Sequence, residues 1–288
     1  MTLVSSPRRD RSGPAAVEQA PAARPARWRR TVRVLLPPVV ALVLFVAAWQ
    51  ALWALAFWPE YQLPAPLTVW SVLWQRIADG QIVGLVWTSL HRAVLGFLAA
   101  MVIATPLGLL VARVKLVGAA LGPLLSGLQS LPSVAWVPAA VLWFGPTNAA
   151  IYLVILLGAV PSIANGLVAG IEQIPPMLPR VAHALCAGRW ATIRHVLLPA
   201  ALPGYLAGLK QGWAFSWRSL MAAELIAVSP QLGLGLGAFL DIGRSLNDMP
   251  TVIAAIGLIL LVGIGVDLLV FRPVERAVLR ARGLATTR

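Results

Sequence analysis

The chain has 288 residues, of which 59% are hydrophobic and only 11% are charged. Soluble domains average about 45–50% apolar and about 25% charged residues, so this composition excludes an ordinary soluble protein and predicts an all-α protein that crosses a membrane several times. The net charge of +13 arises from basic residues clustered in the tails and in alternate loops, a pattern typical of membrane topology and not of nucleic-acid binding.

The first 33 residues are rich in Pro, Ala, Ser and Arg and have no hydrophobic period, which predicts a disordered, basic cytoplasmic tail. Arginines before the first apolar run resemble the basic region of a signal peptide. The run is too long for one and further spans follow, so we expect an uncleaved first helix. A second basic tail is predicted over residues 272–288.

Between the tails, residues 34–271 are predicted to form the membrane domain. A bilayer core requires roughly twenty apolar residues, and six segments meet that length. They lie at about 34–57, 87–112, 119–143, 149–171, 200–227 and 249–271. The third span should be short or kinked, because it contains Pro123, Pro132 and Pro138.

Two further segments are interpreted from their composition. Residues 66–82 read as a helix lying on the membrane surface, with one apolar face made of Leu67, Trp70, Trp74 and Ile77. The glycine-rich run 232–237 reads as a flexible turn into the last hairpin, because it lacks the strand-then-helix context of a phosphate-binding loop.

Lysine and arginine counts near the span ends predict the orientation. With both termini in the cytoplasm, the tails and the loops 113–118 and 172–199 hold nearly all loop cations, and the opposite loops hold only Arg76 and Arg244. The loop 172–199 is long for a membrane protein. Its apolar residues recur at helical spacing on either side of Cys186, Ala187 and Gly188, which predicts two short amphipathic helices joined by a tight turn.

Ionisable residues within membrane spans are costly and therefore mark candidate functional sites. We expect Lys210 and Arg218, with Trp217 and Ser219, to line a path that attracts anions. Arg92 and Glu224 are further candidates for this path. The alternatives are that Arg218 pairs structurally with Glu224, and that Arg92 and Asp267 extend to the membrane interface.

Several kinds of chemistry are absent from the sequence. It has no GxxxxGK[ST] phosphate loop, no HExxH metal motif and no GxSxG nucleophile motif. The single cysteine, Cys186, excludes an internal disulfide, and the three histidines are not spaced as metal ligands. We therefore expect neither an enzyme nor a chain that carries its own cofactor or metal.

The chain resembles the permease subunits of binding-protein-dependent ABC importers with the type I fold, in particular the nitrate, sulfonate, taurine and bicarbonate group. The resemblance covers about residues 35–280. Five stretches carry it: 89–108, 136–145, 158–171, 198–210 and 222–226, which read SLHRAVLGFLAAMVIATPLG, WVPAAVLWFG, GAVPSIANGLVAGI, LPAALPGYLAGLK and AAELI.

The family pattern for the cytoplasmic loop is EAA, three residues, Gly, nine residues, a hydrophobic residue, one residue and Leu-Pro. Aligning Leu198-Pro199 with its end places Val196 at the hydrophobic position and Cys186 at the glycine. Residues 180–182 then occupy the EAA triplet. The departures at Arg180 and Cys186 suggest an altered docking geometry, with the turn shifted to Gly188.

The resemblance implies a multi-pass protein of the bacterial inner membrane that acts with partners. These are a second permease copy, two cytoplasmic ATPase subunits that bind ATP and Mg²⁺, an external solute-binding protein and membrane lipid. The ATPase-coupling loop would comprise Arg180, Val181, Ala182, Ala184, Cys186, Ala187, Gly188, Arg189, Leu198 and Pro199. The implied substrate is an aliphatic sulfonate, taurine, nitrate or a similar anion. A thiamine-precursor-like substrate, an ion-coupled secondary transporter and a non-transporting scaffold are the alternatives.

Overall fold

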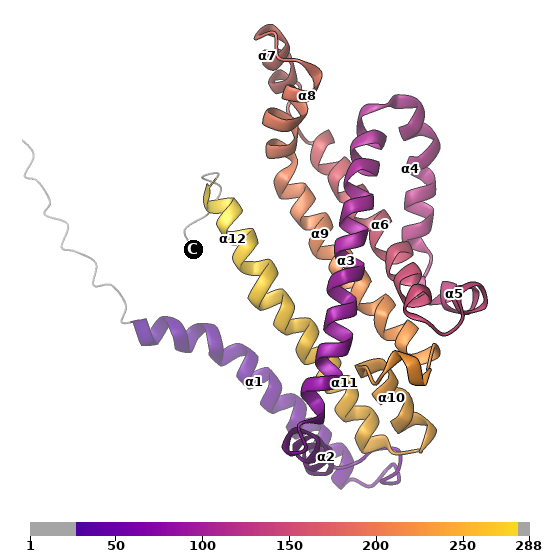
Figure 1. The fold of residues 1–288 in the computed structure, drawn as a ribbon. Coiled ribbons are helices and arrows are strands. Elements are labelled where there is room, and N and C mark those ends of the chain that lie inside the picture. Colours follow the sequence, from indigo (N-terminus) through magenta and orange to yellow (C-terminus); the bar gives the residue numbers. More distant parts are fainter. Residues whose placement is uncertain (1–26, 282–288) are drawn as a thin grey trace, which may run out of the picture. The chain divides into compact units, whose positions relative to one another are not determined.

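The computed structural model describes the backbone of residues 27–281, and the side chains of residues 36–280 except Pro179 and Arg189. Within these bounds the chain is helical and has no strand (Figure 1). Two compact units divide it after Leu52. The first contains most of helix α1 (Arg27–Ala54), whose apolar part, Leu36–Ala54, is long enough to cross a membrane. Residues 1–26 of the predicted tail lie outside the described residues.

The second unit holds the remaining elements, separated by short turns. In chain order they are α2 (Pro66–Ala78), α3 (Gln81–Arg113), α4 (Lys115–Ser130), η1 (Ser133–Trp136), α5 (Val137–Phe144), α6 (Asn148–Glu172), α7 (Met177–Ala184), α8 (Arg189–Thr192), η2 (Ile193–Leu197), α9 (Leu198–Ile226), η3 (Pro230–Leu232), α10 (Leu236–Ser245), α11 (Met249–Val266), η4 (Asp267–Phe271) and α12 (Arg272–Ala281).

The prediction of an all-α membrane protein with several spans is confirmed. Among the described residues, four helical runs are long and apolar enough to cross a membrane: the apolar part of α1, then α3, α6 and the run from Met249 to Arg280. The third predicted span is broken as its prolines indicated, because α4 and the η1–α5 segment meet at 96°. The fifth predicted span corresponds to α9, a helix of 29 residues that carries three charged side chains.

The last helical run is longer than predicted. Residues 267–271 form a π turn, η4, and α12 continues directly from it to Ala281. Residues 272–281, predicted as part of the basic tail, are therefore helical. Pro273 has no amide hydrogen to donate to an i−4 carbonyl, so the wide turn occurs where the α-helical bonding pattern is already interrupted. Residues 282–288 lie outside the described part of the chain.

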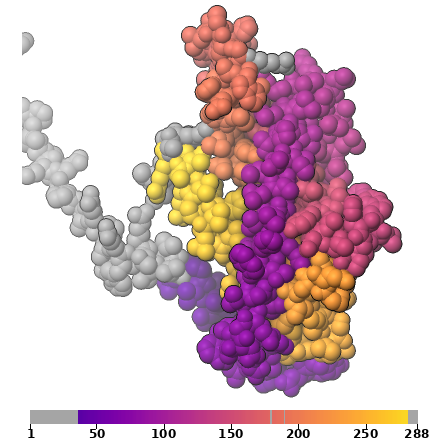
Figure 2. All heavy atoms as spheres, viewed as in Figure 1, coloured from indigo at the N-terminus to yellow at the C-terminus, as the bar shows by residue number. Residues whose placement is uncertain are grey.

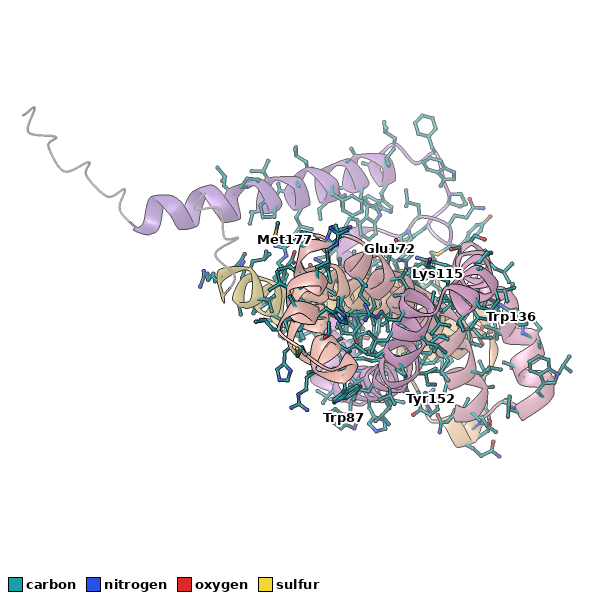
Figure 3. The ribbon with its side chains drawn as sticks, turned by 90° about the horizontal axis from the view of Figure 1, so that it is seen from above. Trp87, Lys115, Trp136, Tyr152, Glu172 and Met177 are labelled. Atoms are coloured by element: carbon teal, nitrogen blue, oxygen red, sulfur yellow. The ribbon has the colours of Figure 1, made fainter. Side chains whose placement is uncertain are left out.

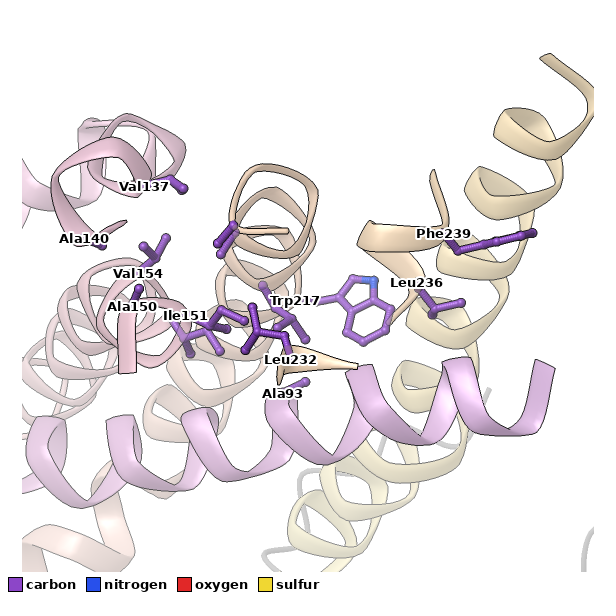
Figure 4. Packing of buried hydrophobic residues seen from close by; sticks show 14 of the residues in the cluster. Ala93, Val137, Ala140, Ala150, Ile151, Val154, Trp217, Leu232, Leu236 and Phe239 are labelled. Carbon is purple, nitrogen blue, oxygen red and sulfur yellow. The ribbon is translucent and has the colours of Figure 1, made fainter. Parts of the chain in front are cut away.

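Helices α3, α6 and α9 form the centre of the second unit. Their apolar side chains meet those of α5, α10 and α11 in the main buried cluster, which includes Ala93, Ile151, Val154, Trp217, Leu232 and Leu236 (Figure 4). Helices α6 and α9 approach most closely through glycines. A Cβ on Gly204 would lie 2.5 Å from the Cα of Gly170, so the two backbones are in direct contact.

The two ends of the second unit differ in character. Helices α7 and α8 lie at one end, and α2 and α10 lie at the other, with α3 and α9 running between them (Figure 1). The predicted surface helix forms as α2, and its four apolar side chains are exposed, with the Trp70 and Trp74 rings stacked 6.4 Å apart. The opposite face of α2 contacts α11.

Candidate functional site

The loop 172–199 folds as predicted into two short helices, α7 and α8, joined by a tight turn. The Cys186 amide donates to the His183 carbonyl at 3.0 Å, and the Ala187 amide donates to the Ala182 carbonyl at 3.0 Å. This pair of bonds is the Schellman ending of a helix, which requires a left-handed residue at its centre. Cys186 supplies it, with φ of +55°.

The expected shift of the turn to Gly188 is therefore wrong. Gly188 does not have a positive φ, and Cys186 adopts the left-handed conformation at the position where the family pattern has glycine. Such a conformation costs a non-glycine residue roughly 1–2 kcal/mol. The two capping bonds offset this cost, so the helix ends where the pattern places its end despite the substitution.

The α7–α8 segment presents a large apolar surface. It protrudes at the upper end of the second unit in Figure 2. Figure 3 gives the view from above, in which Met177 of α7 is labelled. Five large apolar side chains are between 42% and 77% exposed: Met177, Leu178, Val181, Leu185 and Trp190. The Arg180 side chain is also exposed, whereas Ala182 is buried against the rest of the loop.

The other predicted loop residues are small or undescribed. Ala184 and Gly188 are exposed, Ala187 is half-buried, and the side chain of Arg189 lies outside the described residues.

A π turn joins this loop to α9. Residues 193–197 form η2, closed by a bond from the Leu198 amide to the Ile193 carbonyl. Pro199 follows and has no amide hydrogen, as at η4. Leu197 is 2% exposed and packs with Leu167 and Ala201 in a buried cluster. The α8 side of the loop is thus continuous with α9, and α9 begins at Leu198-Pro199 as predicted.

Lys210 and Arg218 both lie on an exposed stripe of α9, together with Gln211. Lys210 Nζ is 2.9 Å from Asp267 Oδ1 of η4, with the two side chains 45% and 30% exposed. Arg218 makes no ion pair with a described residue. Its guanidinium lies over the Phe215 ring at 4.9 Å, and its Nε donates to the Ala214 carbonyl.

A groove borders this stripe between α9 and the end of the last helical run. Its volume is about 460 Å³. The lining is mostly apolar and includes Leu206, Ala207, Phe271, Val278 and Leu279, with Lys210, Gln211 and Glu275 as its polar members. Lys210 is ion-paired with Asp267, and the Glu275 carboxylate lines the same groove, so the mostly apolar lining holds one cation and one carboxylate.

Trp217 and Ser219 do not share the exposed stripe. Trp217 is 7% exposed and its ring stacks on Trp213. Ser219 is fully buried, and its hydroxyl donates to the Ser133 hydroxyl of η1 at 2.7 Å. The structure therefore places two of the four grouped path candidates inside the subunit.

The remaining candidates, Arg92 and Glu224, form a buried ion pair. Arg92 Nη1 is 2.9 Å from Glu224 Oε1, and the side chains are 6% and 2% exposed. Both sequence alternatives for these residues are wrong, because Glu224 pairs with Arg92 instead of Arg218 and Arg92 is buried instead of extending to the interface. Sequence analysis also missed Ser89 and Asn148, which bond to the pair.

No group of three or more His, Cys, Asp or Glu side chains is placed to hold a metal ion within the part of the chain that the structure describes. The features described above are an exposed apolar surface on α7 and α8, two exposed cations on α9 and a buried ion pair.

Comparison with known proteins decides what these features belong to. Residues 104–276 match the family of binding-protein-dependent transport system inner membrane components. The chain belongs to this family. The permease is 32% identical over 224 residues to the riboflavin transport permease RibX of Chloroflexus aurantiacus, covering 77% of this chain and 82% of RibX.

Two further relatives cover nearly the whole chain. The putative aliphatic sulfonates transport permease SsuC of Bacillus subtilis is 31% identical over 267 residues, covering 93% of this chain and 92% of SsuC. The nitrate import permease NrtB of Leptolyngbya laminosa is 30% identical over 276 residues, covering 93% and 94%.

A solved structure shares the fold. A chain of the inward-facing MetNI methionine ABC transporter superposes with a TM-score of 0.53 at 21% identity, covering 68% of the permease and 95% of that chain. The permease is thus a multi-pass transport component of an ABC importer, and the resemblance seen in the sequence is confirmed.

Proposed function

We propose that this permease forms the translocation path of an ATP-driven importer of a small anion, with an aliphatic sulfonate, taurine or nitrate as the leading candidates. The observation that carries the proposal is the exposed stripe of α9, where Arg218 is exposed and makes no ion pair with a described residue, and Lys210 is partly exposed beside its partner Asp267. Exposed cations in a membrane helix are costly unless they face a polar path or a partner. Two copies of the chain, facing each other across this stripe, would enclose such a path.

The energy for transport is proposed to come from a pair of separate ATPase subunits that bind ATP and Mg²⁺. Support comes from the absence of a phosphate loop in the sequence and from the exposed apolar side chains of the loop 172–199. Apolar surface of this extent on a short helical segment marks a protein interaction site. We call this segment the coupling loop, because η2 and Leu198-Pro199 join it directly to α9.

The proposed topology has six crossings with both termini in the cytoplasm of a bacterium. It counts α1, α3, the broken α4–α5 segment, α6, α9 and the α11–α12 run. The end of the second unit that holds α7 and α8 would then be cytoplasmic. It holds most of the described basic residues that lie in loops or in the terminal turns of these helical runs: Arg113, Lys115, Arg180, Arg194, Arg276 and Arg280. An external solute-binding protein would meet the opposite end.

One relative favours a second class of substrate. RibX is named for riboflavin transport, so a heteroaromatic vitamin-like solute, similar in kind to a thiamine precursor, is the other candidate. Binding measurements of taurine, nitrate and riboflavin to the solute-binding protein encoded beside the permease would separate these classes. Tight binding of riboflavin alone would overturn the anion proposal.

Two experiments test the transport role. The tagged permease should co-purify with an ATPase subunit, and its absence would favour an ion-coupled secondary transporter or a scaffold. Arg218→Gln should then reduce substrate uptake in vesicles that contain the assembled complex. Normal uptake with lowered stability of the Arg218→Gln subunit would show that Arg218 is structural and would remove it from the path.

A further inference from the structure

Arg92 bonds three separate segments of the permease. Its guanidinium donates to Glu224 Oε1 of α9 at 2.9 Å and to Asn148 Oδ1 of α6 at 2.9 Å, and it also donates to the carbonyl of Leu232 in η3. Arg92 itself belongs to α3. One buried side chain of α3 therefore contacts the first residue of α6, the last turn of α9 and the segment that follows α9.

The carboxylate of Glu224 reaches the same segment from the other side. Glu224 Oε2 accepts from the Ser89 hydroxyl at 2.7 Å and from the Gly237 amide at 3.1 Å. The Ser89 hydroxyl in turn accepts from the Leu236 amide at 2.8 Å. The first amides of α10 are thus satisfied by the network, which also places an anion at a helix N-terminus.

The glycines of this segment allow the close contact. A Cβ on Gly235 would lie 2.5 Å from Glu224 Oε2, and one on Gly237 would lie 2.6 Å from the Glu224 Cβ. The run 232–237, predicted as a flexible turn, is therefore packed on the ion pair, and the side chains of Leu232 and Leu236 are buried. A cavity of about 250 Å³ lies between the pair and residues 227–234.

Energetics explain why such a pair is unusual. A buried ion pair gains little over well-packed apolar residues, because desolvation offsets most of its attraction, whereas loss of one partner leaves an unpaired buried charge. The pair instead fixes where residues 227–237 lie relative to α3, α6 and α9, because its hydrogen bonds join that segment to the three helices. The segment itself has few bonds that would hold it there, because only η3 is helical between Ala227 and Gly235.

Helix α9 connects this network to the coupling loop. It begins at Leu198, beside the loop, and ends at Ile226, two residues after Glu224. Its 29 residues span about 43 Å at 1.5 Å per residue. If the first residues of α9 move, Glu224 should therefore move with them, because both belong to one continuous helix.

We propose that Arg92 and Glu224 are positioning residues that fasten residues 227–237 to the outer end of α9, so that movement of the coupling loop is transmitted to this external segment. The proposal rests on the proposed function for its membrane orientation and for its partners, the ATPase and the solute-binding protein. Val228 and Leu234 are 50% and 57% exposed and give the segment an apolar outer surface for that binding protein.

The first experiment measures the segment alone and needs no partner. Cys186→Ser removes the single cysteine of the chain, and Leu234→Cys then supplies one reporter on the segment. Glu224→Gln should raise the rate at which a membrane-impermeant maleimide labels residue 234 in intact membranes by about tenfold, a typical size for coupling between sites. Arg244→Gln is the matched control, because it breaks the exposed Arg244–Asp241 pair of α10 at the same end of the unit.

The second experiment measures transmission in the assembled complex. Glu224→Gln should reduce the stimulation of ATP hydrolysis by the loaded binding protein about tenfold, whereas Arg244→Gln should leave it unchanged. Ser89→Ala, which keeps the ion pair but removes two hydrogen bonds, should have an intermediate effect on both measurements.

Wild-type labelling and wild-type stimulation in Glu224→Gln would overturn the proposal. Failure of both Glu224→Gln and Ser89→Ala to assemble would also overturn it, because the network would then be purely structural. If no ATPase co-purifies with the wild-type chain, the proposed function fails. In that case the labelling experiment still tests the fastening of residues 227–237.

Discussion

Gly208 of α9 faces Gly166 of α6 so closely that a Cβ on Gly208 would lie 2.7 Å from the Cα of Gly166. One turn along, Gly204 faces Gly170 in the same way. Small residues four apart on each helix allow the backbones to touch, which is how membrane helices associate without a hydrophobic driving force between them. The contact joins the helix before the coupling loop to the helix after it.

Gly208→Ala should therefore lower the stability of the permease. The added methyl group meets backbone atoms, which cannot rotate away, so the helices must separate. Overpacking of this kind costs roughly 1–3 kcal/mol, and about 1 kcal/mol shifts Tm by roughly 2–4 °C in domains of 150–250 residues. Thermal unfolding of the purified protein in detergent measures the change.

Gly257→Ala provides the control for this substitution. A Cβ on Gly257 of α11 would meet no atom within 4 Å, so the same gain in helix propensity occurs there without a clash. Equal Tm values for Gly208→Ala and Gly257→Ala would contradict the close packing of α6 and α9.

Replacing Cys186 with glycine should stabilise the coupling loop. Glycine adopts the left-handed conformation without steric cost, so Cys186→Gly should gain about 1 kcal/mol locally. Hydrogen exchange of the Ala187 amide, which donates to the Ala182 carbonyl, should slow by roughly fivefold, as that free energy implies. Gly188→Ala, at a residue without positive φ, should leave this exchange rate unchanged. Faster exchange in Cys186→Gly would contradict the assignment of the helix end.

The Lys210–Asp267 pair should behave as one unit in stability. Lys210→Met leaves the Asp267 carboxylate with only Arg272, 3.3 Å away, and Asp267→Asn leaves Lys210 without its partner. The double variant should lower Tm by less than the sum of the two single variants, because either single variant already removes the Lys210–Asp267 interaction. Thermal unfolding of all four proteins gives the coupling, and additive changes would show that the pair contributes nothing.

Reversing the charge of Arg180 should alter docking of the ATPase. This side chain is exposed on α7, where the family pattern has glutamate. Arg180→Glu should change the amount of ATPase that co-purifies or the substrate-stimulated rate of ATP hydrolysis. Arg276→Glu, on α12, introduces the same charge change outside the loop and should change neither. If Arg180→Glu also changed neither, Arg180 would serve only surface solvation.

Local patterns predicted most of the fold, whereas long-range pairs escaped sequence analysis. The predicted span at 149–171 matches α6, because a run of about twenty apolar residues between polar ends forms a helix that crosses the membrane. The turn at Cys186 was located from spacing, but its conformation depended on capping bonds that spacing does not reveal. Arg92 and Glu224 are 132 residues apart, and nothing in their neighbourhoods distinguishes this pairing from that of Glu224 with Arg218.

The same limit applies to the path candidates. Lys210, Trp217, Arg218 and Ser219 are near neighbours in sequence, and grouping them assumed that α9 presents one functional face. Burial separates them, because Trp217 and Ser219 are buried inside the subunit whereas Lys210 and Arg218 are exposed. The packing of α9 against α6 determines which face of α9 is buried and which is exposed.

The π turn at Ile193–Leu197 determines how the coupling loop is rotated about the helix axis relative to α9. A π turn holds one more residue than an α turn, and one residue corresponds to about 100° of rotation around a helix axis. Deleting a single residue from η2 would therefore point the apolar side chains of the coupling loop in a different direction, although every contact of α9 within the bundle could be kept. The direction in which the coupling loop faces therefore depends on the length of η2 to within one residue.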